Sequence, residues 1–269
     1  MAKSEPLVAA LPWNHFGRKN IGYLFAIWNV ASAIFDFDDD NVLKTNSRGE
    51  TISPVPLPPK SGKLPAVRKN ATAFNPYPLM GSTSPGAWPR GLPLTAVTDP
   101  ASYQSEVREE AVAWESVSVF QSLADHDPDV DAIYRLTREQ KQFDFLSKIP
   151  SVAVPEGVYT PFNAQACVLL RDSFFAMLLP VSVPGRVSDI WRSYILQRLL
   201  WDMDKRIAIT KPVVVQYRPA HNFLKDMDAE QDLYFKTPSL IKFLDSWDGT
   251  DIPDMGQRMV QLYIDLYER

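Results

Sequence analysis

The spacing of hydrophobic residues predicts that helices and strands alternate along the chain. Ile21, Leu24, Phe25 and Trp28 recur with the period of a helix, which predicts one helix over residues 20–30. The next apolar run, over residues 33–37, is short and rich in β-forming side chains, so we expect a buried strand there. Further strands are predicted at residues 117–120, 165–170, 207–209 and 213–217.

The remaining segments carry mostly helical patterns. Short helices or helical turns are predicted at residues 106–114, 132–136 and 172–179, and a polar loop is predicted at residues 121–131. Ser188 is a suitable N-cap for a longer helix that ends near residue 203. The last two helices are predicted at residues 240–247 and 257–267. The second of these helices lies in the C-terminal segment, residues 252–269. Because we find no repeat and no clear boundary, we expect one α/β domain over residues 1–269.

Prolines are concentrated in residues 53–100, and the whole chain has 23 Pro against 11 Gly. Such a tract could be a flexible linker. However, Phe74, Tyr77 and Trp88 lie within it, and a solvated linker does not need large aromatic side chains. We therefore expect a long ordered loop that packs on the domain, a type of segment that often carries binding residues.

The composition excludes several classes of function. A net charge of −4 and a pI of about 5.5 offer no basic surface for nucleic acid or an anionic membrane. The single cysteine, Cys167, excludes an internal disulfide and a cysteine-rich zinc site. The longest apolar stretch, residues 21–35, is too short to span a bilayer, and the N-terminus lacks the apolar core of a signal peptide. We therefore expect no nucleic-acid partner and no membrane segment in this chain.

Four carboxylates, Asp36, Asp38, Asp39 and Asp40, lie at the end of the strand predicted at residues 33–37. Open α/β sheets bind ligands at the carboxyl ends of their strands. Closely spaced aspartates repel one another, and a divalent cation such as Mg²⁺, Mn²⁺ or Ca²⁺ offsets that repulsion. Such a cation neutralises a diphosphate leaving group, which is the chemistry of nucleotide sugars. The alternative is a solvated turn or a helix cap, and a D-x-D pair by itself is weak support for a metal site.

Two further polar clusters are candidates for chemistry. Residues 184–189 form a turn into a helix N-terminus, where backbone N–H groups can bind an anion and Asp189 is held rigidly. The alternative for Asp189 is compensation of the helix dipole. His221 follows the strand predicted at residues 213–217 and is a candidate metal ligand, although a lone surface histidine is the more common explanation. The sequence contains no G-x-S-x-G, P-loop, G-x-G-x-x-G or H-E-x-x-H motif.

A long series of motifs runs in order through residues 18–247. It begins with R-K-N-I-G-Y-L-F-A-I, I-F-D-F-D-D-D-N, F-N-P-Y-P, W-P-R-G-L-P-L and Q-S-L-A-D-H-D-P-D-V-D-A-I-Y-R-L-T. It continues with P-F-N-A-Q, L-L-P-V-S-V-P-G-R-V-S-D-I-W-R-S-Y, Q-R-L-L-W-D, H-N-F-L-K-D-M-D-A-E-Q-D-L-Y and L-I-K-F-L-D-S-W. Such a series is far more specific than a single D-x-D. By these motifs the chain resembles the STELLO-type family of glycosyltransferases.

This resemblance implies a glycosyltransferase A-type fold, which is a Rossmann-like mixed sheet flanked by helices. Only 37 residues precede Asp38, so we expect the first nucleotide-binding strands of that fold to be lacking. The order of the motifs is also similar to that of plant reversibly glycosylated polypeptides, the UDP-arabinopyranose mutases. By that similarity, the run from Asp38 to Asp40 would bind Mn²⁺ and the ribose or diphosphate of UDP. Arg186 with Asp189 would face the sugar or the acceptor.

The candidate site residues fall into three groups. The catalytic candidates are Arg186 and Asp189, the latter as a general base; the cofactor-binding candidates are Asp38, Asp39, Arg18 and Lys19; the candidate ligands of Mn²⁺ or Mg²⁺ are Asp38, Asp40 and His221.

Two functions remain open at this point. The first is a metal-dependent glycosyltransferase, or a sugar mutase, that uses a nucleotide sugar such as a UDP-sugar and acts on a glycan or protein acceptor. The alternative is a scaffold without catalysis, for instance in a polysaccharide synthase complex, or an inactive fragment. The family resemblance implies the Golgi lumen, with which the sequon Asn70-Ala71-Thr72 is compatible.

Overall fold

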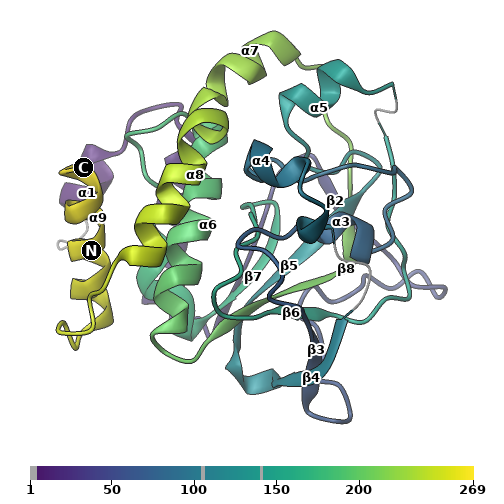
Figure 1. Cartoon of the computed structure of the whole chain (residues 1–269), viewed down its shortest axis with the longest axis horizontal. Coiled ribbons are helices and arrows are strands. Elements are labelled where there is room, and N and C mark those ends of the chain that lie inside the picture. The colour runs from purple at the N-terminus through teal and green to yellow at the C-terminus, as the bar shows by residue number, and fades with distance from the viewer. Residues whose placement is uncertain (1–4, 104–106, 140–141) are drawn as a thin grey trace.

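The computed structural model describes residues 5–103, 107–139 and 142–269, and the strands in these ranges form one open mixed sheet with helices packed against it (Figure 1). The strands are β1 (Ala33–Phe37), β2 (Asn41–Leu43), β3 (Lys63–Val67), β4 (Val107–Ala113), β5 (Val117–Asp125), β6 (Val152–Val154), β7 (Ala166–Leu170) and β8 (Arg206–Gln216). Their order across the sheet is β1-β7-β5-β8-β6-β3-β4, and β2 pairs with β8 outside this path. The α/β class predicted from the sequence is therefore confirmed.

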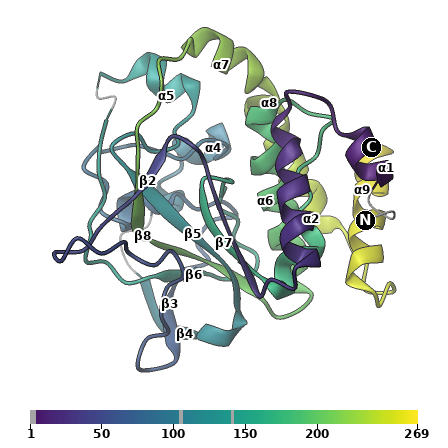
Figure 2. The same cartoon turned by 180° about the vertical axis from the view of Figure 1, so that it is seen from behind.

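The helices surround one side and one end of this sheet (Figure 1, Figure 2). The α-helices are α1 (Glu5–Ala10), α2 (Lys19–Trp28), α3 (Pro76–Leu79), α4 (Leu94–Val97), α5 (Ala132–Thr137), α6 (Gly185–Trp201), α7 (Phe223–Ala229), α8 (Gln231–Ser246) and α9 (Met255–Tyr267). Short 3₁₀ helices are η2 (Phe16–Arg18), η3 (Pro100–Ser102), η4 (Trp114–Ser116) and η5 (Arg171–Ala176). Among the described residues, no helix is both long enough and apolar enough to cross a membrane.

The pairing of the strands brings four chain segments to one edge of the sheet. β5 and β8 are parallel, while β7 is antiparallel to both β1 and β5. The carboxyl ends of β1, β5 and β8 therefore point the same way, and the chain enters β7 at that same edge. Because ligands of open α/β sheets bind beyond such strand ends, this edge is where a site is expected.

A large hydrophobic core joins the sheet to α6 and α8. Leu169 and Ile209 from the strands pack there with Leu196 and Leu199 of α6 and Leu244 of α8, and the exposed area of each is close to zero. A smaller cluster, which includes Phe120 and Val168, covers the opposite face of the sheet. The sheet thus buries apolar side chains on both faces, which explains why the sequence of β5 does not alternate between apolar and exposed polar residues.

Helix α2 forms where its apolar period predicts it, but that period does not mark the face that the fold buries. Asn20 and Tyr23 face the interior, while Phe25 and Trp28 are 66% and 48% exposed. The Asn20 side chain bonds to both the backbone N–H and C=O of Leu179, each at 2.9 Å. A buried amide that satisfies two backbone groups outweighs the preference of the apolar stripe for the interior.

Two expectations for residues 106–131 are wrong. Val107–Ala113 is strand β4 and not part of a helix, and Glu106 lies outside the described residues. β4 is at the end of the strand order, where one side of the strand is unpaired and polar residues are tolerated. The predicted loop at residues 121–131 is strand as far as Asp125, because the polar side chains of Gln121 and Ser122 find buried hydrogen-bond partners.

The structure differs from the prediction in three further places: the start of α6, the extent of β8, and the segment of α7 and α8. Helix α6 begins at Gly185 after Pro184, and the hydroxyl of the predicted cap Ser188 instead donates to the C=O of Pro180 at 2.7 Å. The strands predicted at residues 207–209 and 213–217 are one strand, β8, whose register against β5 shifts at the Ser122/Ala124 position. Helix α7 and the first half of α8 were not predicted, and Pro238, a residue that disfavours a helix interior, lies inside α8.

The proline-rich segment contributes directly to the core. Phe74, Tyr77 and Trp88 are buried in the main hydrophobic cluster, and the segment contains β3, α3 and α4. Asn75 caps α3 by accepting the N–H of Tyr77, and its side-chain amide donates to the C=O of Ala87 at 2.8 Å. The hydroxyl of Tyr77 donates to the C=O of Asp129, in the loop after β5, at 2.8 Å, and this bond ties the segment to the sheet edge described above.

Candidate functional site

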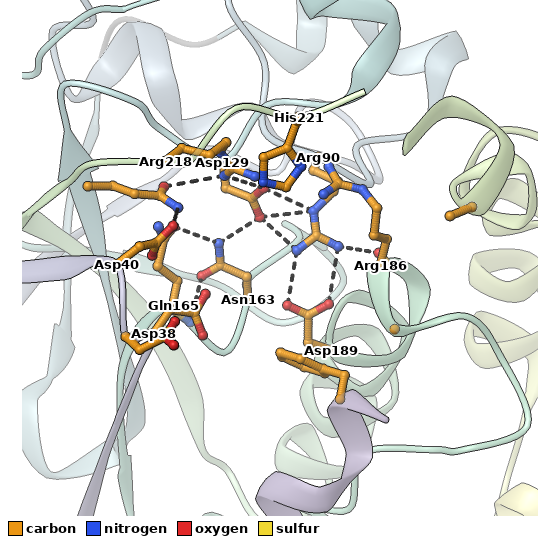
Figure 3. Close-up of a pocket in the computed structure, with 15 residues that line it drawn as sticks. Asp38, Asp40, Arg90, Asp129, Asn163, Gln165, Arg186, Asp189, Arg218 and His221 are labelled. Atoms are coloured by element: carbon orange, nitrogen blue, oxygen red, sulfur yellow. Dashed lines mark hydrogen bonds and ion pairs between the residues drawn. The ribbon is translucent and has the colours of Figure 1, made fainter. Parts of the chain in front are cut away.

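A cavity of about 430 Å³ opens at the edge where the carboxyl ends of β1, β5 and β8 meet the start of β7 (Figure 3). Three lining residues, Phe16, Gly185 and Ala229, are neither charged nor amides. The others carry charged, amide or imidazole side chains: Asp38, Asp39, Asp40, Arg90, Asp129, Asn163, Gln165, Arg186, Asp189, Gln216, Arg218 and His221. Such a concave site with convergent polar groups is the usual form of a small-molecule site.

The guanidinium of Arg90 lies between two carboxylates at the centre of the site. Its Nη1 and Nη2 donate to the two oxygens of Asp189 at 3.2 and 3.1 Å. Its Nε donates to Asp129 at 2.9 Å, and its Nη1 also donates to the C=O of Arg186. Burial by itself lowers the pKa of Arg90, but the two carboxylates outweigh burial and raise that pKa well above its usual value. Arg90 therefore joins the proline-rich segment, the loop after β5 and the start of α6 at one point.

Asp129 is held as an anion by its neighbours. Burial tends to raise the pKa of this carboxyl, but Arg90 and then Arg218 bring it well below the usual range. The side-chain amide of Asn163 also donates to Asp129, at 2.7 Å. Asn163 is in turn fixed by Gln121 of β5, which donates to its side-chain oxygen at 3.1 Å. The loop before β7 is thus locked to the loop after β5.

The acidic run that ends β1 divides into groups with different partners. Asp36 faces the helices and accepts hydrogen bonds from Lys19 at 2.9 Å and from the hydroxyl of Tyr23, so its role is structural. Asp38 lines the cavity and pairs with Lys19 at 2.8 Å. Burial raises the pKa of Asp38 to about 6, although Lys19 opposes the shift.

Asp40 is the member of the run that has a buried carboxylate oxygen without a hydrogen-bond partner. One carboxylate oxygen accepts a hydrogen bond from Gln216 at 3.0 Å, while Oδ1 is buried without a hydrogen-bond partner. A buried carboxylate oxygen without a partner is costly. Since Asp40 lines the cavity, a ligand bound there is placed to satisfy this atom.

Two arginines line another part of the cavity, and each has a buried nitrogen without a hydrogen-bond partner: Nη2 of Arg186, which forms an ion pair with Glu230, and Nε of Arg218. Arg186 is bound by Glu230, whose Oε1 accepts from its Nε at 2.5 Å. Arg218 has no hydrogen-bond partner at Nε, and the nearest oxygen of Asp127 is 3.8 Å away. Burial lowers the pKa of Arg218, and the attraction of Asp129 opposes that shift only in part. Arg218 is therefore a buried cation at the cavity wall with unused hydrogen-bonding capacity.

The described residues contain no group of three or more His, Cys, Asp or Glu side chains that could enclose a metal ion. His221 lines the cavity but pairs with Asp226 at 3.2 Å. Mg²⁺ and similar hard cations, however, are commonly held by one or two carboxylates while substrate phosphates and water complete the shell. Asp38 and Asp40 fit that partial type of site, and the unpartnered Oδ1 of Asp40 is the observation that supports the fit.

The structure brings six of the eight predicted site residues to the cavity and leaves two outside its lining. Asp38, Asp39, Asp40, Arg186, Asp189 and His221 line it. Lys19 lies behind the lining, where it links Asp36 and Asp38 to the C=O of Ala164. Arg18 stacks on Trp13, with its guanidinium carbon 4.2 Å from the ring centroid, so its position does not support cofactor binding.

Asp189 has a different environment from that expected of a general base. Both of its oxygens accept from Arg90, and the N–H groups of Ala164 and Ile190 also donate to it, at 3.2 and 3.0 Å. Four donors therefore occupy the acceptor positions of this carboxylate. The geometry favours a positioning role, in which Asp189 holds Arg90 and the loop before β7.

Sequence reasoning missed Arg90, Asp129, Asn163, Gln165 and Arg218 as site residues. The first four lie inside motifs that carried the family resemblance: W-P-R-G-L-P-L, D-H-D-P-D-V-D and P-F-N-A-Q. For Arg90, Asn163 and Gln165 the available signal was a polar residue inside an otherwise apolar or proline-rich motif, whereas Asp129 lies among other acids. Arg218 had none beyond its position directly after a strand.

Next to the site, Asp131 gives the stability of the fold a distinctive pH dependence. It caps α5 and accepts from the indole N–H of Trp88 at 2.6 Å. Burial raises its pKa from 3.8 to about 6, against the opposing effect of its hydrogen bonds. The folded state therefore binds the proton more tightly than the unfolded state, so this carboxyl stabilises the fold below about pH 4 and loses that contribution by about pH 6 to 7.

We expect Asp131→Asn to remove this dependence. The pKa of Asp131 in the folded state is roughly two pH units above its unfolded value, which corresponds to about 3 kcal/mol of unfolding free energy at about 1.4 kcal/mol per unit. Urea unfolding of both proteins between about pH 4 and 7 measures it: relative to the variant, the wild type should lose stability as the pH rises. Parallel curves for the two proteins would show that Asp131 does not titrate in this range.

Comparison with known proteins identifies the family to which these features belong. Residues 186–269 match the family described as STELLO glycosyltransferases. The chain is 33% identical over 250 residues to the probable glycosyltransferase STELLO2 of Arabidopsis thaliana and 33% identical over 252 residues to STELLO1 of the same plant. Each alignment covers 88% of this chain, and the chain spans about a third, 31%, of the length of these relatives. The resemblance seen in the motifs is thus confirmed, and the chain belongs to the STELLO glycosyltransferase family.

Proposed function

We propose that the cavity binds the diphosphate of a nucleotide sugar, such as a UDP-sugar, together with Mn²⁺ or Mg²⁺, and that the protein transfers the sugar. Family membership supports a sugar donor. The observation that carries the proposal is that two residues of the cavity lining have buried atoms without a hydrogen-bond partner, Oδ1 of Asp40 and Nε of Arg218. A metal–diphosphate complex offers a cation to the first and phosphate oxygens to the second.

The carboxylates at the end of β1 are the proposed metal ligands. Asp38 and Asp40 would hold the cation, with Asp39 beside them at the cavity wall. A bound Mn²⁺ or Mg²⁺ would supply charge neutralisation to the diphosphate leaving group. Asp38 is already paired with Lys19, so Asp40 contributes the oxygen that is free in the protein alone.

The arginines provide the complementary positive charge for the phosphates. Arg218 has unused donors at the cavity wall, and Arg186 is presented from the first turn of α6. Arg90 is not proposed to touch the substrate, because its guanidinium is fully engaged by Asp129, Asp189 and a backbone carbonyl. It instead holds these segments in place, and rigid placement of donors is a main source of transition-state stabilisation.

The proposed A-type glycosyltransferase fold agrees with a mixed sheet that places its acidic run at a strand end. A glycan or protein acceptor and a place in the Golgi are proposals that rest on the family resemblance alone.

Calorimetric titration of UDP in the presence and absence of Mn²⁺ tests the proposal. We expect UDP to bind only with Mn²⁺ and Asp40→Asn to weaken that binding about tenfold or more, since it removes a charged ligand oxygen. Arg218→Gln should weaken it to a similar degree through the phosphates. Asp228→Asn is the matched control, because Asp228 is exposed on α7 and does not line the cavity.

Wild-type protein that binds no UDP with either metal would contradict the proposal. That result would favour the alternative of a scaffold without catalysis, for which the exposed apolar side chains of α2 provide a possible interaction surface.

A further inference from the structure

Two more cavities adjoin each other beside helix α8, and neither shares a lining residue with the candidate site. The first, of about 490 Å³, lies between the segment that contains α4 and the second half of α8. The second, of about 410 Å³, lies beside the end of α6. Thr72 and Asp245 line both, so the two cavities are neighbours, and we call them together the α4–α8 groove. Each part lies within the usual volume range of ligand sites.

The groove combines apolar walls with an aromatic side chain at one end. Pro93 and Ala96 of the α4 segment face Pro238 and Ile241 of α8 across the first cavity. Trp201, at the end of α6, lines the second cavity and is packed behind by Tyr159, with ring centroids 4.7 Å apart. A flat, rigidly held ring at a half-exposed position suits the apolar C–H face of a ring-shaped ligand.

Polar groups along the first cavity can both donate and accept hydrogen bonds. Ser102 lines it and is only 1% exposed, yet its hydroxyl has no hydrogen-bond partner. Thr72 and Thr95 add hydroxyls, and Asp99 and Asp245 add carboxylate oxygens. A buried hydroxyl without a partner is unfavourable unless a ligand or water satisfies it.

Ion pairs within the protein neutralise much of the charge in the second cavity. In the second cavity, Asp202 is paired with Arg198 at 2.6 Å and with Arg258 at 2.9 Å, and Glu156 is paired with Arg206 at 3.1 Å. The lining of the first cavity contains two carboxylates, Asp99 and Asp245, and one cation, Lys242. A phosphate would meet those carboxylates, and a polycation would meet Lys242.

The lining of the groove therefore suits a neutral ligand that has many hydroxyl groups and flat C–H faces. We propose that the α4–α8 groove binds a neutral oligosaccharide, with one sugar ring on Trp201 and the hydroxyls of others on Ser102, Asp99 and Asp245. The proposal does not rest on the transfer reaction proposed above, because the groove shares no residue with that site. It gives the protein a place to hold a glycan chain away from the donor cavity.

Titration of the full chain with neutral hexasaccharides tests this proposal by heteronuclear NMR or calorimetry. The probes are cellohexaose, xylohexaose and mannohexaose, with hexagalacturonate and hexalysine as charged comparisons. We expect at least one neutral probe to bind and Thr95→Trp to weaken that binding about tenfold or more, because the indole fills the first cavity. Thr98→Trp is the matched control: Thr98 is exposed on the same segment but does not line the groove.

Asp245→Asn gives a second, smaller change at the junction of the two cavities and does not fill space. It should weaken binding of the neutral probe, while Lys236→Ala, on an exposed part of the same helix, should not. The proposal is overturned if no neutral probe binds, if Thr95→Trp and Thr98→Trp bind equally well, or if only a charged probe binds. Retention of metal-dependent UDP binding by Thr95→Trp separates this result from the function proposed for the other cavity.

Discussion

Replacing Arg90 with alanine is expected to lower the free energy of unfolding by about 3–5 kcal/mol. The substitution leaves Asp129 and Asp189 buried near one another without the cation that lies between them. The side chains of these carboxylates are 9% and 3% exposed, so water can replace the lost partner only in part. Three chain segments would also lose the contact that joins them, which should reduce binding at the cavity.

Urea unfolding at neutral pH measures this effect. Arg206→Ala is the control, because its partner Glu156 is half exposed and such a pair contributes about 0–1 kcal/mol. Arg90→Lys should fall between the two, since an ammonium group neutralises charge but cannot donate to both carboxylates with the geometry of a guanidinium. If Arg90→Ala and Arg206→Ala were equally stable, the central role of Arg90 would be refuted.

Replacing Glu230 with alanine is expected to have an effect of similar size, again about 3–5 kcal/mol. Glu230 is completely buried at the junction of α7 and α8. Its Oε2 accepts from the N–H of Ala132 at 2.8 Å and from the hydroxyl of Tyr234 at 2.5 Å, while Oε1 binds Arg186. Alanine would leave these groups without their acceptor at a point where α5, α6 and α8 meet.

The same substitution should reach the candidate site through Arg186. Without Glu230, the remaining acid near Arg186 is Asp226, at 3.7 Å, so the guanidinium would be free to leave the cavity wall. We expect thermal unfolding to shift strongly for Glu230→Ala and hardly at all for Asp228→Ala, an exposed position on α7. An unfolding free energy within about 1 kcal/mol of the wild type would count against this role of Glu230.

Local sequence patterns predicted the strands and helices whose own apolar pattern matches the structure that they form. The runs at β1, β5 and β7 are short and largely apolar, those at β1 and β5 also contain β-branched and aromatic residues, and the structure forms strands there. The amphipathic pattern of α9 predicted its helix in the same way. β4 was missed because Glu and Ala favour helices locally, and only pairing with β3 makes the segment a strand.

The face that a helix buries was not decided by its hydrophobic period alone. For α2, Phe25 and Trp28 belong to the apolar period that predicted the helix, but the helix turns Asn20 and Tyr23 inward. The reason is tertiary: Leu179 offers a backbone N–H and C=O to Asn20, and Asp36 accepts from Tyr23. No pattern within residues 20–30 contains that information.

The sequence by itself determined the α/β class, the family and the presence of an acidic run at a strand end. It also indicated most of the charged residues that line the cavity. Only the tertiary structure decided which of these residues are free to bind a ligand, because that depends on partners distant in the chain. Asp36 accepts hydrogen bonds from Lys19 and Tyr23, and Asp189 accepts them from Arg90. Asp40 and Arg218, in contrast, each have a buried atom without a hydrogen-bond partner. Burial makes such atoms costly, and a ligand that pairs with them recovers that cost.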